Sequence, residues 1–418
     1  MPGDKSISHR AAILAAIANG SSRLVNYSTS EDCASTLSCL RQLGITYERV
    51  ENEIQVNGEG LRGFKQPTSE LNCGNSGTTM RLLLGVLAAQ PFESILTGDA
   101  SLLSRPMTRV ARPLELMGAS VSSKDGRPPL GMSGTSDLKA ISYKLPVASA
   151  QVKSCVLLAG LSAHGRTEVI ESLGSTRDHT ERLLAWFGVP VTQSNESIGV
   201  AGPVEFDSNE VKIPGDVSSA AFFIAAAALL PGSELVVTNV GLNPTRIHFL
   251  SLLRSFGLDV ARNNVREVCN EPMGEIVVRG IRGDSLPHQD IQLTGEAISQ
   301  LIDELPLLAV VATQLDCRFE IRDARELRYK ESDRIKTTVS NLRLMGAEVE
   351  EYDDGLTLTG PIKLHPARLP SFGDHRIAMA FAVAALFATG ECEIDDSDCV
   401  GISFPNFFQM LNRVIVAG

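Results

Sequence analysis

Residues 214–232 read PGDVSSAAFFIAAAALLPG, and this stretch shows the pattern that decides the fold. Asp and Ser favour a helix start, and the Gly after the apolar run favours a helix end. The run is well below the ~18 apolar residues that a membrane span needs. A helix that is apolar on every side is typical of a protein core.

The same pattern recurs five more times along the chain. The other openings with their runs are PGDKSISHRAAILAAIANG (2–20), GNSGTTMRLLLGVLAAQ (74–90), PVASAQVKSCVLLAGL (146–161), IDELPLLAVVATQ (302–314) and GDHRIAMAFAVAALFATG (373–390). Successive openings lie about 70 residues apart, with one longer gap of about 90, which indicates a repeat architecture.

A second segment repeats in phase with the first. Its copies are LRQLGITY (40–47), LELMGASV (114–121), LAWFGVPV (184–191), LRSFGLDV (253–260) and LRLMGAEV (342–349). Each predicts an amphipathic helix that ends at a Gly and turns directly into a strand. Short strands are also expected at 53–56, 276–279 and 355–359. Two signatures in one phase favour six α/β units in two domains over unrelated crossovers.

Composition narrows the class of protein. A chain of 418 residues that is 43% hydrophobic can bury large cores and has the length of two domains. A net charge of −11 argues against nucleic acid as a partner. The eight cysteines form no CxxC pair, and the seven histidines show no metal-ligand spacing. The opening residues resemble no signal or transit peptide. We therefore expect a cytoplasmic monomer with no membrane partner, no metal and reduced thiols.

Basic residues gather at the polar openings and in nearby loops. They are Lys5, Arg10, Arg105, Lys153, Arg177, Lys330, Arg334 and Arg376. Taken singly, each is more typical of a solvated surface charge than of a ligand. A helix start, however, offers free N–H groups and the positive end of the helix dipole. Several such starts with their cations together predict a pocket for a small, multiply charged anion.

Eight motifs in order resemble those of the 5-enolpyruvylshikimate-3-phosphate synthase family. They are PGDKSISHR (2–10), GNSGTTMR (74–81), SRPM (104–107), SAQVKS (149–154), RDHTERLL (177–184), GDVSSAAFF (215–223), RYKESDRI (328–335) and GDHRIAMAFA (373–382). SAQVKS, RDHTERLL and NPTR (243–246) resemble the bacterial subgroup that includes glyphosate-tolerant members. The resemblance implies an α/β, two-domain enolpyruvyl-transferase fold, with three βαβαββ repeats and buried parallel helices in each domain.

The resemblance also implies an activity. Family members transfer the enolpyruvyl group of phosphoenolpyruvate to the 5-hydroxyl of shikimate 3-phosphate and release phosphate, without a cofactor. Residues 1–214 would form a domain that mainly binds shikimate 3-phosphate, and 215–418 a domain with the catalytic carboxylates and the phosphoenolpyruvate clamp. The active site would lie in the cleft between them. Family members usually begin with one more strand than this chain shows before Pro2.

Site residues follow from the matching motifs. By resemblance, the residues that bind shikimate 3-phosphate are Lys5, Ser6, Arg10, Ser149, Ala150, Gln151, Arg177, Asp303 and Lys330. Those that bind phosphoenolpyruvate are Lys5, Asn75, Gly77, Arg105, Gln151, Arg334 and Arg376. The expected catalytic residues are Asp303, Glu331 and Lys5, with Asp303 as base and Glu331 moving protons at the enol methylene.

Simpler roles stay open for some of these residues. Ser149 would serve equally as an ordinary helix cap, and Asp303 would cap the helix of residues 302–314. Glu331 and Arg334, at i and i+3, would also suit a solvated helix face. Ile402 occupies a position where the family carries a lysine that contacts phosphoenolpyruvate. Two alternative functions are a transferase acting on UDP-N-acetylglucosamine and an inactive anion-binding relative.

Overall fold

The computed structural model describes residues 1–172, 174–194, 196–281 and 288–415, and the chain divides into two compact units. The N-terminal unit consists of Pro2–Pro214 with Glu267–Glu271. The C-terminal unit consists of Met1, Gly215–Arg266 and the described residues within Pro272–Gly418. The predicted division into 1–214 and 215–418 places Met1 and Glu267–Glu271 differently. His179 Nδ1 lies 2.6 Å from Glu271 Oε1, a buried contact that ties this short segment to the N-terminal unit.

The N-terminal unit contains three four-stranded sheets with one shared arrangement. In each, two strands pair in parallel and a hairpin adds two antiparallel strands. The first repeat comprises α1 (Lys5–Ile17), β1 (Asn19–Val25), α2 (Glu31–Gln42), β2 (Thr46–Val50) and β3 (Glu53–Glu59), joined by β12 (Glu210–Lys212). The second comprises β4 (Leu71–Asn72), α3 (Gly77–Leu87), β5 (Glu93–Thr97), α4 (Ala100–Leu103), α5 (Thr108–Leu116), β6 (Ser120–Lys124) and β7 (Arg127–Ser133). The third comprises β8 (Ser142–Lys144), α6 (Ala150–Gly160), β9 (Gly165–Ile170), α7 (His179–Trp186), β10 (Val191–Gln193) and β11 (Ser197–Gly202).

The C-terminal unit repeats the plan with variations. Its first repeat comprises α8 (Val217–Leu229), β13 (Glu234–Gly241), α9 (His248–Ser255), β14 (Asp259–Val268) and β15 (Glu271–Arg279). The next comprises β16 (Gln289–Leu293), α10 (Glu296–Leu301), α11 (Leu305–Ala312), β17 (Cys317–Ile321), η1 (Arg325–Tyr329), α12 (Arg334–Leu344), β18 (Val349–Tyr352) and β19 (Gly355–Thr359). The last comprises β20 (Arg368–Pro370), α13 (His375–Ala385), β21 (Glu393–Asp395), η2 (Ser397–Ile402) and α14 (Phe407–Val414), and its sheet has two strands in the described residues.

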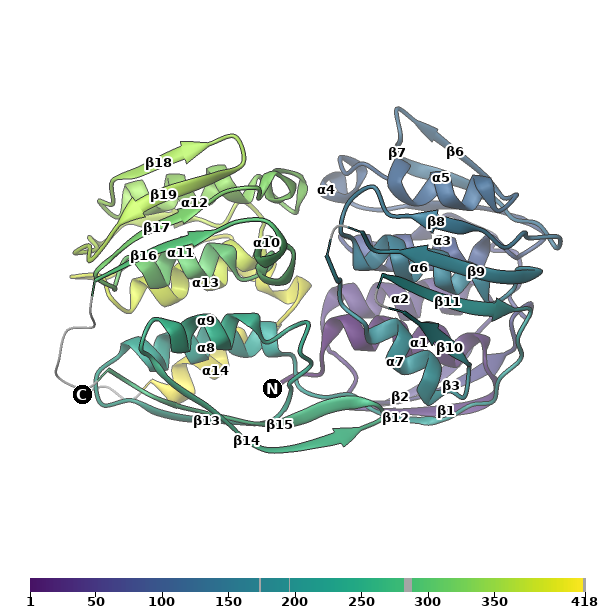
Figure 1. Ribbon diagram of the computed structural model, residues 1–418, viewed down its shortest axis with the longest axis horizontal. Coiled ribbons are helices and arrows are strands. Elements are labelled where there is room, and N and C mark those ends of the chain that lie inside the picture. Colours follow the sequence, from purple (N-terminus) through teal and green to yellow (C-terminus); the bar gives the residue numbers. More distant parts are fainter. Residues whose placement is uncertain (173, 195, 282–287, 416–418) are drawn as a thin grey trace. The chain divides into compact units, whose positions relative to one another are not determined.

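The predicted apolar runs form the buried helices of the two cores. In each unit the sheets lie outside and these helices lie inside (Figure 1). Every residue of α8 is buried, as the run at 214–232 predicts. Helix α13 ends at Ala385, earlier than the predicted run, and the three residues after it are only half-buried. The run is therefore longer than the helix it encodes.

The repeated glycines stop the second set of helices as predicted. Each has φ between 80° and 104°, the left-handed region in which a side chain is strained. They are Gly44, Gly118, Gly188, Gly257 and Gly346. The predicted strands at 53–56, 276–279 and 355–359 are also present, within β3, β15 and β19. In the described part of the chain, each helix is too short or too polar for a bilayer span.

Candidate active site

Lys5 lies in the first turn of α1, beside a capped helix start. Asp4 Oδ1 accepts a hydrogen bond from the Ile7 N–H at 2.9 Å, which fixes this turn. Lys5 Nζ lies 2.6 Å from Asp32 Oδ2 on α2, and the Lys5 side chain keeps 17% of its surface exposed. Ser6, the next residue, is half-buried. The ammonium is thus held at the positive end of a helix, where it can meet an anion.

Arg10 is buried one helical turn further along α1. Its guanidinium donates to Thr180 Oγ1 at 2.8 Å, to Ser154 Oγ at 2.8 Å and to the Ser6 carbonyl at 2.9 Å. These contacts join α1 to α6 and α7 and leave the side chain 3% exposed. Arg10 therefore holds three helix starts together, and its predicted contact with a ligand stays a prediction.

The turn before α3 carries a second polar group. Arg105 donates to Asn75 Oδ1 at 2.7 Å and to Ser101 Oγ at 2.9 Å. Asn75 in turn donates to Asp99 Oδ2 at 2.7 Å. The motifs GNSGTTMR and SRPM, which are separate in sequence, therefore meet at the N-terminus of α3. Arg105 adds a cation to a helix start that already favours anions.

Gln151 connects this group to the start of α6. Its Oε1 accepts from Arg81 at 2.6 Å, and its Nε2 donates to Thr78 Oγ1 at 2.8 Å. Ser149 caps α6 and accepts from the Val152 N–H, while Ala150 is the first residue of the helix. The helix-cap role that the sequence left open for Ser149 is therefore present. It does not conflict with anion binding, because the neighbouring N–H groups still point out of the helix start.

Gly77 leaves space that these cations occupy. A Cβ at position 77 would lie 2.6 Å from a terminal nitrogen of Arg81 and 3.4 Å from one of Arg105. Because Gln151 holds Arg81, Gly77→Ala would disturb that hydrogen bond, a loss worth about 1–3 kcal/mol. If this turn binds phosphoenolpyruvate, as the family resemblance implies, we expect KM for phosphoenolpyruvate to rise about tenfold, since 1.4 kcal/mol corresponds to tenfold. Steady-state kinetics with each substrate varied will check this. Equal KM values in the variant and the original chain would contradict it.

Lys153 does not belong to the anion-binding cations, contrary to the sequence-based expectation. Its ammonium lies 2.6 Å from Glu181 and 3.0 Å from Glu171, and the side chain is 1% exposed. Burial lowers the pKa of Lys153, but the two carboxylates outweigh burial and raise it. The ammonium also donates to the Thr176 carbonyl at 3.4 Å, next to half-buried Arg177. Lys153 is thus a buried structural charge.

The C-terminal unit has its own charged group around Arg334, at the start of α12. Arg334 lies 2.9 Å from Asp374 Oδ2, 2.5 Å from Glu331 Oε2 and 3.5 Å from Asp303 Oδ1. Its side chain is 1% exposed, so the solvated helix face considered from the sequence is wrong. Burial lowers the pKa of the Arg334 guanidinium, but Asp374, Glu331 and Asp303 raise it well above the ordinary value. Arg334 stays charged and fixes the carboxylates.

Asp303 does not cap the helix that follows it. Glu304 occupies the N-cap position of α11, which has no side-chain cap. The Asp303 carboxylate instead lies 3.5 Å from Arg334 and 3.7 Å from Arg376. Its side chain keeps 17% of its surface exposed, between two arginines that are almost fully buried. A partly exposed carboxylate held by two cations suits contact with a substrate hydroxyl.

Arg376 and Lys330 complete the predicted residues of this unit. Arg376 lies in the first turn of α13, where its backbone N–H donates to the cap Asp374 at 2.9 Å. Its guanidinium lies 3.7 Å from Glu304 and donates to the Asp303 carbonyl at 3.3 Å. Lys330 follows η1 and lies 3.5 Å from Glu326, at i and i−4. The structure thus brings Asp303, Glu331, Arg334 and Arg376 together, whereas Lys330 pairs with Glu326.

Three residues of these groups were given no role from the sequence. Asp32 pairs with Lys5, Arg81 binds Gln151, and Arg246 is buried near the start of α8. Arg81 and Arg246 lie within motifs already noted, GNSGTTMR and NPTR. The sequence could have identified Arg81 and Arg246, because a basic residue inside or beside a buried helix needs partners for its charge. Asp32 carries no comparable signal, since an acidic residue in the first turn of a helix is common and its pairing with Lys5 depends on how α1 and α2 pack.

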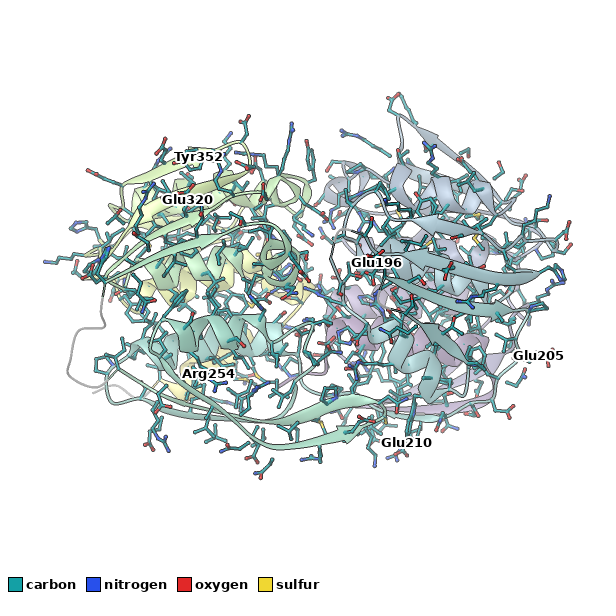
Figure 2. The ribbon with its side chains drawn as sticks, viewed as in Figure 1. Glu196, Glu205, Glu210, Arg254, Glu320 and Tyr352 are labelled. Carbon is teal, nitrogen blue, oxygen red and sulfur yellow. The ribbon has the colours of Figure 1, made fainter. Side chains whose placement is uncertain are left out.

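The chain as a whole is acidic, and the described residues offer no metal centre. Glu205 and Glu210 point away from the ribbon of the N-terminal unit (Figure 2). The basic groups at the helix starts are therefore local exceptions on a chain of net charge −11. Across the described ranges, no group of three or more His, Cys, Asp or Glu residues could hold a metal ion.

Repeated α/β units with basic helix starts define the class of this protein. The structure is similar to the crystal structure of the enolpyruvyl transferase NikO from Streptomyces tendae, with a TM-score of 0.77. The match covers 99% of this chain and 93% of that one at 17% identity, so it shows the fold alone. The fold is that of the enolpyruvyl transferases.

The sequence comparisons narrow this class. The sequence model of the family EPSP synthase (3-phosphoshikimate 1-carboxyvinyltransferase) matches residues 1–411. The chain therefore belongs to this family. The 3-phosphoshikimate 1-carboxyvinyltransferase of Koribacter versatilis is 50% identical over 99% of this chain and 95% of that protein. The 3-phosphoshikimate 1-carboxyvinyltransferase of Desulforamulus reducens is 46% identical over 100% of this chain and 96% of that protein. An EPSP synthase structure from Acinetobacter baumannii has a TM-score of 0.86 and 40% identity, over 99% of this chain and 94% of that one. The family resemblance read from the motifs is confirmed.

Proposed function

We propose that Lys5, Asp303 and Glu331 carry the chemistry of an enolpyruvyl transfer in this chain. The chain is a transferase of the shikimate pathway, which leads to aromatic amino acids. It transfers the enolpyruvyl group of phosphoenolpyruvate to the 5-hydroxyl of shikimate 3-phosphate and releases phosphate. The observation that supports the residue roles best is the partly exposed Asp303 carboxylate between Arg334 and Arg376.

The first step is an addition to the enol. Asp303 takes the proton of the 5-hydroxyl while the oxygen attacks C2 of phosphoenolpyruvate. Glu331, within the same charged group, gives a proton to the methylene carbon C3. This forms a tetrahedral intermediate that carries both substrates. Lys5 offsets negative charge at the reacting centre from the helix start of α1.

The second step eliminates phosphate from the intermediate. The C–O bond to phosphate breaks as the methyl carbon loses a proton, which restores the enol double bond in the product. Glu331 takes that proton back. The proton that Asp303 took from the 5-hydroxyl passes to the departing phosphate. Asp303 and Glu331 therefore both return to their starting protonation states, and the residues need no external co-reactant. Alignment of two bound anions supplies much of the remaining rate gain.

Substrate binding involves further residues, together with Lys5 and Asp303. We assign shikimate 3-phosphate to Lys5, Ser6, Arg10, the turn at 149–151, Arg177, Asp303 and Lys330. We assign phosphoenolpyruvate to Lys5, Asn75, Gly77, Arg105, Gln151, Arg334 and Arg376. Arginine forks match the planar carboxylate and the phosphate of these ligands. The two sets come from both units, so we propose that both units act on the same pair of substrates.

The eight cysteines are all free, which is typical of a reducing compartment and supports a cytoplasmic location. The monomeric state stays a prediction from the sequence. The cellular location and the oligomeric state leave the proposed residue roles unchanged.

An assay with two acceptors tests the function. We expect phosphate release from phosphoenolpyruvate with shikimate 3-phosphate and none with UDP-N-acetylglucosamine. Mass spectrometry of the product will identify the enolpyruvyl ether. Release with the nucleotide sugar alone would favour the alternative transferase, and release with neither acceptor would favour the inactive relative.

A further inference from the structure

Arg246 ends the NPTR motif, which has no part in the mechanism above. The side chain of Asn243 folds the motif into a turn, because its Oδ1 accepts from the Thr245 N–H at 2.9 Å and from its hydroxyl at 2.7 Å. The Arg246 N–H also donates to the Asn243 carbonyl at 2.8 Å. This turn places Arg246 just before α9, where the residue is 5% exposed. A buried guanidinium set by a dedicated turn has a specific partner.

That partner is the N-terminus of α8. Arg246 donates to Ser218 Oγ at 2.8 Å and lies 3.4 Å from Asp216 Oδ1. Asp216 is also the cap of α8, since its Oδ1 accepts from the Ser218 N–H at 2.9 Å. Arg246 therefore binds both polar side chains at this helix start.

Ser218 passes the contact on to Glu304. A guanidinium only donates, so Ser218 Oγ accepts from Arg246 and has its single proton free for another acceptor. It donates that proton to Glu304 Oε1, 2.5 Å away. The same Glu304 oxygen lies 3.7 Å from the Arg376 guanidinium. One connected path thus runs from Arg246 through Ser218 and Glu304 to Arg376, across the starts of α9, α8, α11 and α13.

The charges along this path balance. Arg246 and Arg376 are positive, and Asp216 and Glu304 are negative. Without Arg246, Asp216 and Glu304 would stay buried with one cation fewer along the path, and an uncompensated buried charge is costly. The Arg376 guanidinium would then be drawn closer to Glu304. It would have less freedom to bind a ligand anion.

We propose that Arg246 is a positioning residue for phosphoenolpyruvate, which it supports by holding Glu304 through Ser218 and so keeping Arg376 available. The proposal rests on the proposed function, in which Arg376 binds phosphoenolpyruvate. Arg246 itself touches no reacting atom. Because Arg376 is assigned to phosphoenolpyruvate and not to shikimate 3-phosphate, the effect of Arg246 should be specific to phosphoenolpyruvate.

Steady-state kinetics of five variants test the proposal. Arg246→Gln removes the charge, Arg246→Lys keeps it, and Ser218→Ala breaks the path. Arg376→Gln removes the proposed ligand contact itself. Leu253→Ala, in the buried face of α9, is the matched control for general disturbance of this helix. For each variant, kcat and the KM values for phosphoenolpyruvate and shikimate 3-phosphate are measured.

We expect Arg246→Gln and Ser218→Ala to raise KM for phosphoenolpyruvate about tenfold, which is the loss of one charge-assisted hydrogen bond. KM for shikimate 3-phosphate should change less than about twofold, because Arg376 is not assigned to that substrate. Arg246→Lys should recover most of the affinity, and Leu253→Ala should leave both KM values unchanged.

Two results would overturn the proposal. One is an equal rise of both KM values in Arg246→Gln, and the other is a rise for phosphoenolpyruvate in Leu253→Ala as large as in Arg246→Gln. If Arg376→Gln leaves KM for phosphoenolpyruvate unchanged, the ligand role of Arg376 is itself wrong, and the positioning role fails with it. Absence of turnover in the unaltered chain would instead refute the proposed function.

Discussion

Replacing Asp303 by Asn should lower kcat about 10²–10⁴-fold, the usual contribution of a general base. The amide keeps the shape of the side chain but takes no proton from the substrate hydroxyl. Arg334 keeps its contacts with Asp374 and Glu331 in this variant, so the charged group should remain assembled. The measurement is the rate of phosphate release at saturating concentrations of both substrates.

Glu320→Gln is the matched control for this change. Glu320 lies on β17 of the same unit (Figure 2) and pairs with Arg318 at 3.4 Å, and it is not among the partners of Arg334 described above. We expect it to turn over at the rate of the original chain. If Asp303→Asn shows the same kcat as Glu320→Gln, then Asp303 is not the base.

Replacing Lys153 by Met should reduce the free energy of unfolding by about 3–5 kcal/mol, the cost of breaking a buried ion pair from one side. The change leaves Glu171 and Glu181 buried without their shared cation. Urea unfolding followed by fluorescence will measure it. Trp186, the single tryptophan, lies at the end of α7, the helix that carries Glu181, and so reports on the N-terminal unit.

The loss of stability in this variant should depend on pH. Burial raises the pKa of Glu181 above 4.5, and the contact with Lys153 opposes that rise. Without Lys153 the pKa of Glu181 rises further in the folded state, so the folded state binds more protons than the unfolded state. The deficit should therefore be full above the raised pKa and shrink as the pH falls through it toward 4.5.

Two further variants separate a buried charge from a general effect. Lys144→Met removes an exposed lysine on β8 of the same repeat and should change the unfolding free energy by less than about 0.5 kcal/mol. Glu181→Gln combined with Lys153→Met removes one buried charge and should recover part of the loss. Unfolding of Lys153→Met at the same urea concentration as Lys144→Met would show that the ion pair contributes nothing.

The repeat plan was predictable from the sequence because local signals encode it. Caps such as Asp216 and Ser149, apolar runs such as that of α8, and stop glycines such as Gly257 each act within a few residues. Helix starts and ends follow from such short-range rules. The family motifs then gave the candidate site residues, whose roles stay predictions.

Partners far apart in sequence were not predictable in the same way. Lys153 and Arg334 are both basic residues near helix starts, and the sequence does not show that each is 1% exposed and paired with carboxylates from other parts of the chain. The family motifs predicted Asp303 as the base, with a helix cap as the alternative, but only the fold places its carboxylate against Arg334 and Arg376. Whether a charge faces solvent, a ligand or a buried partner depends on tertiary packing, which no local pattern records.

The central claim is that charged helix starts from both units bind one phosphoenolpyruvate and one shikimate 3-phosphate. A crystal structure of Asp303→Asn with both substrates bound tests it most directly. We predict that oxygen atoms of one phosphoenolpyruvate molecule lie within about 3.2 Å of guanidinium nitrogens of both Arg105 and Arg376. Phosphoenolpyruvate bound to residues of one unit only, or away from both arginines, would contradict the account.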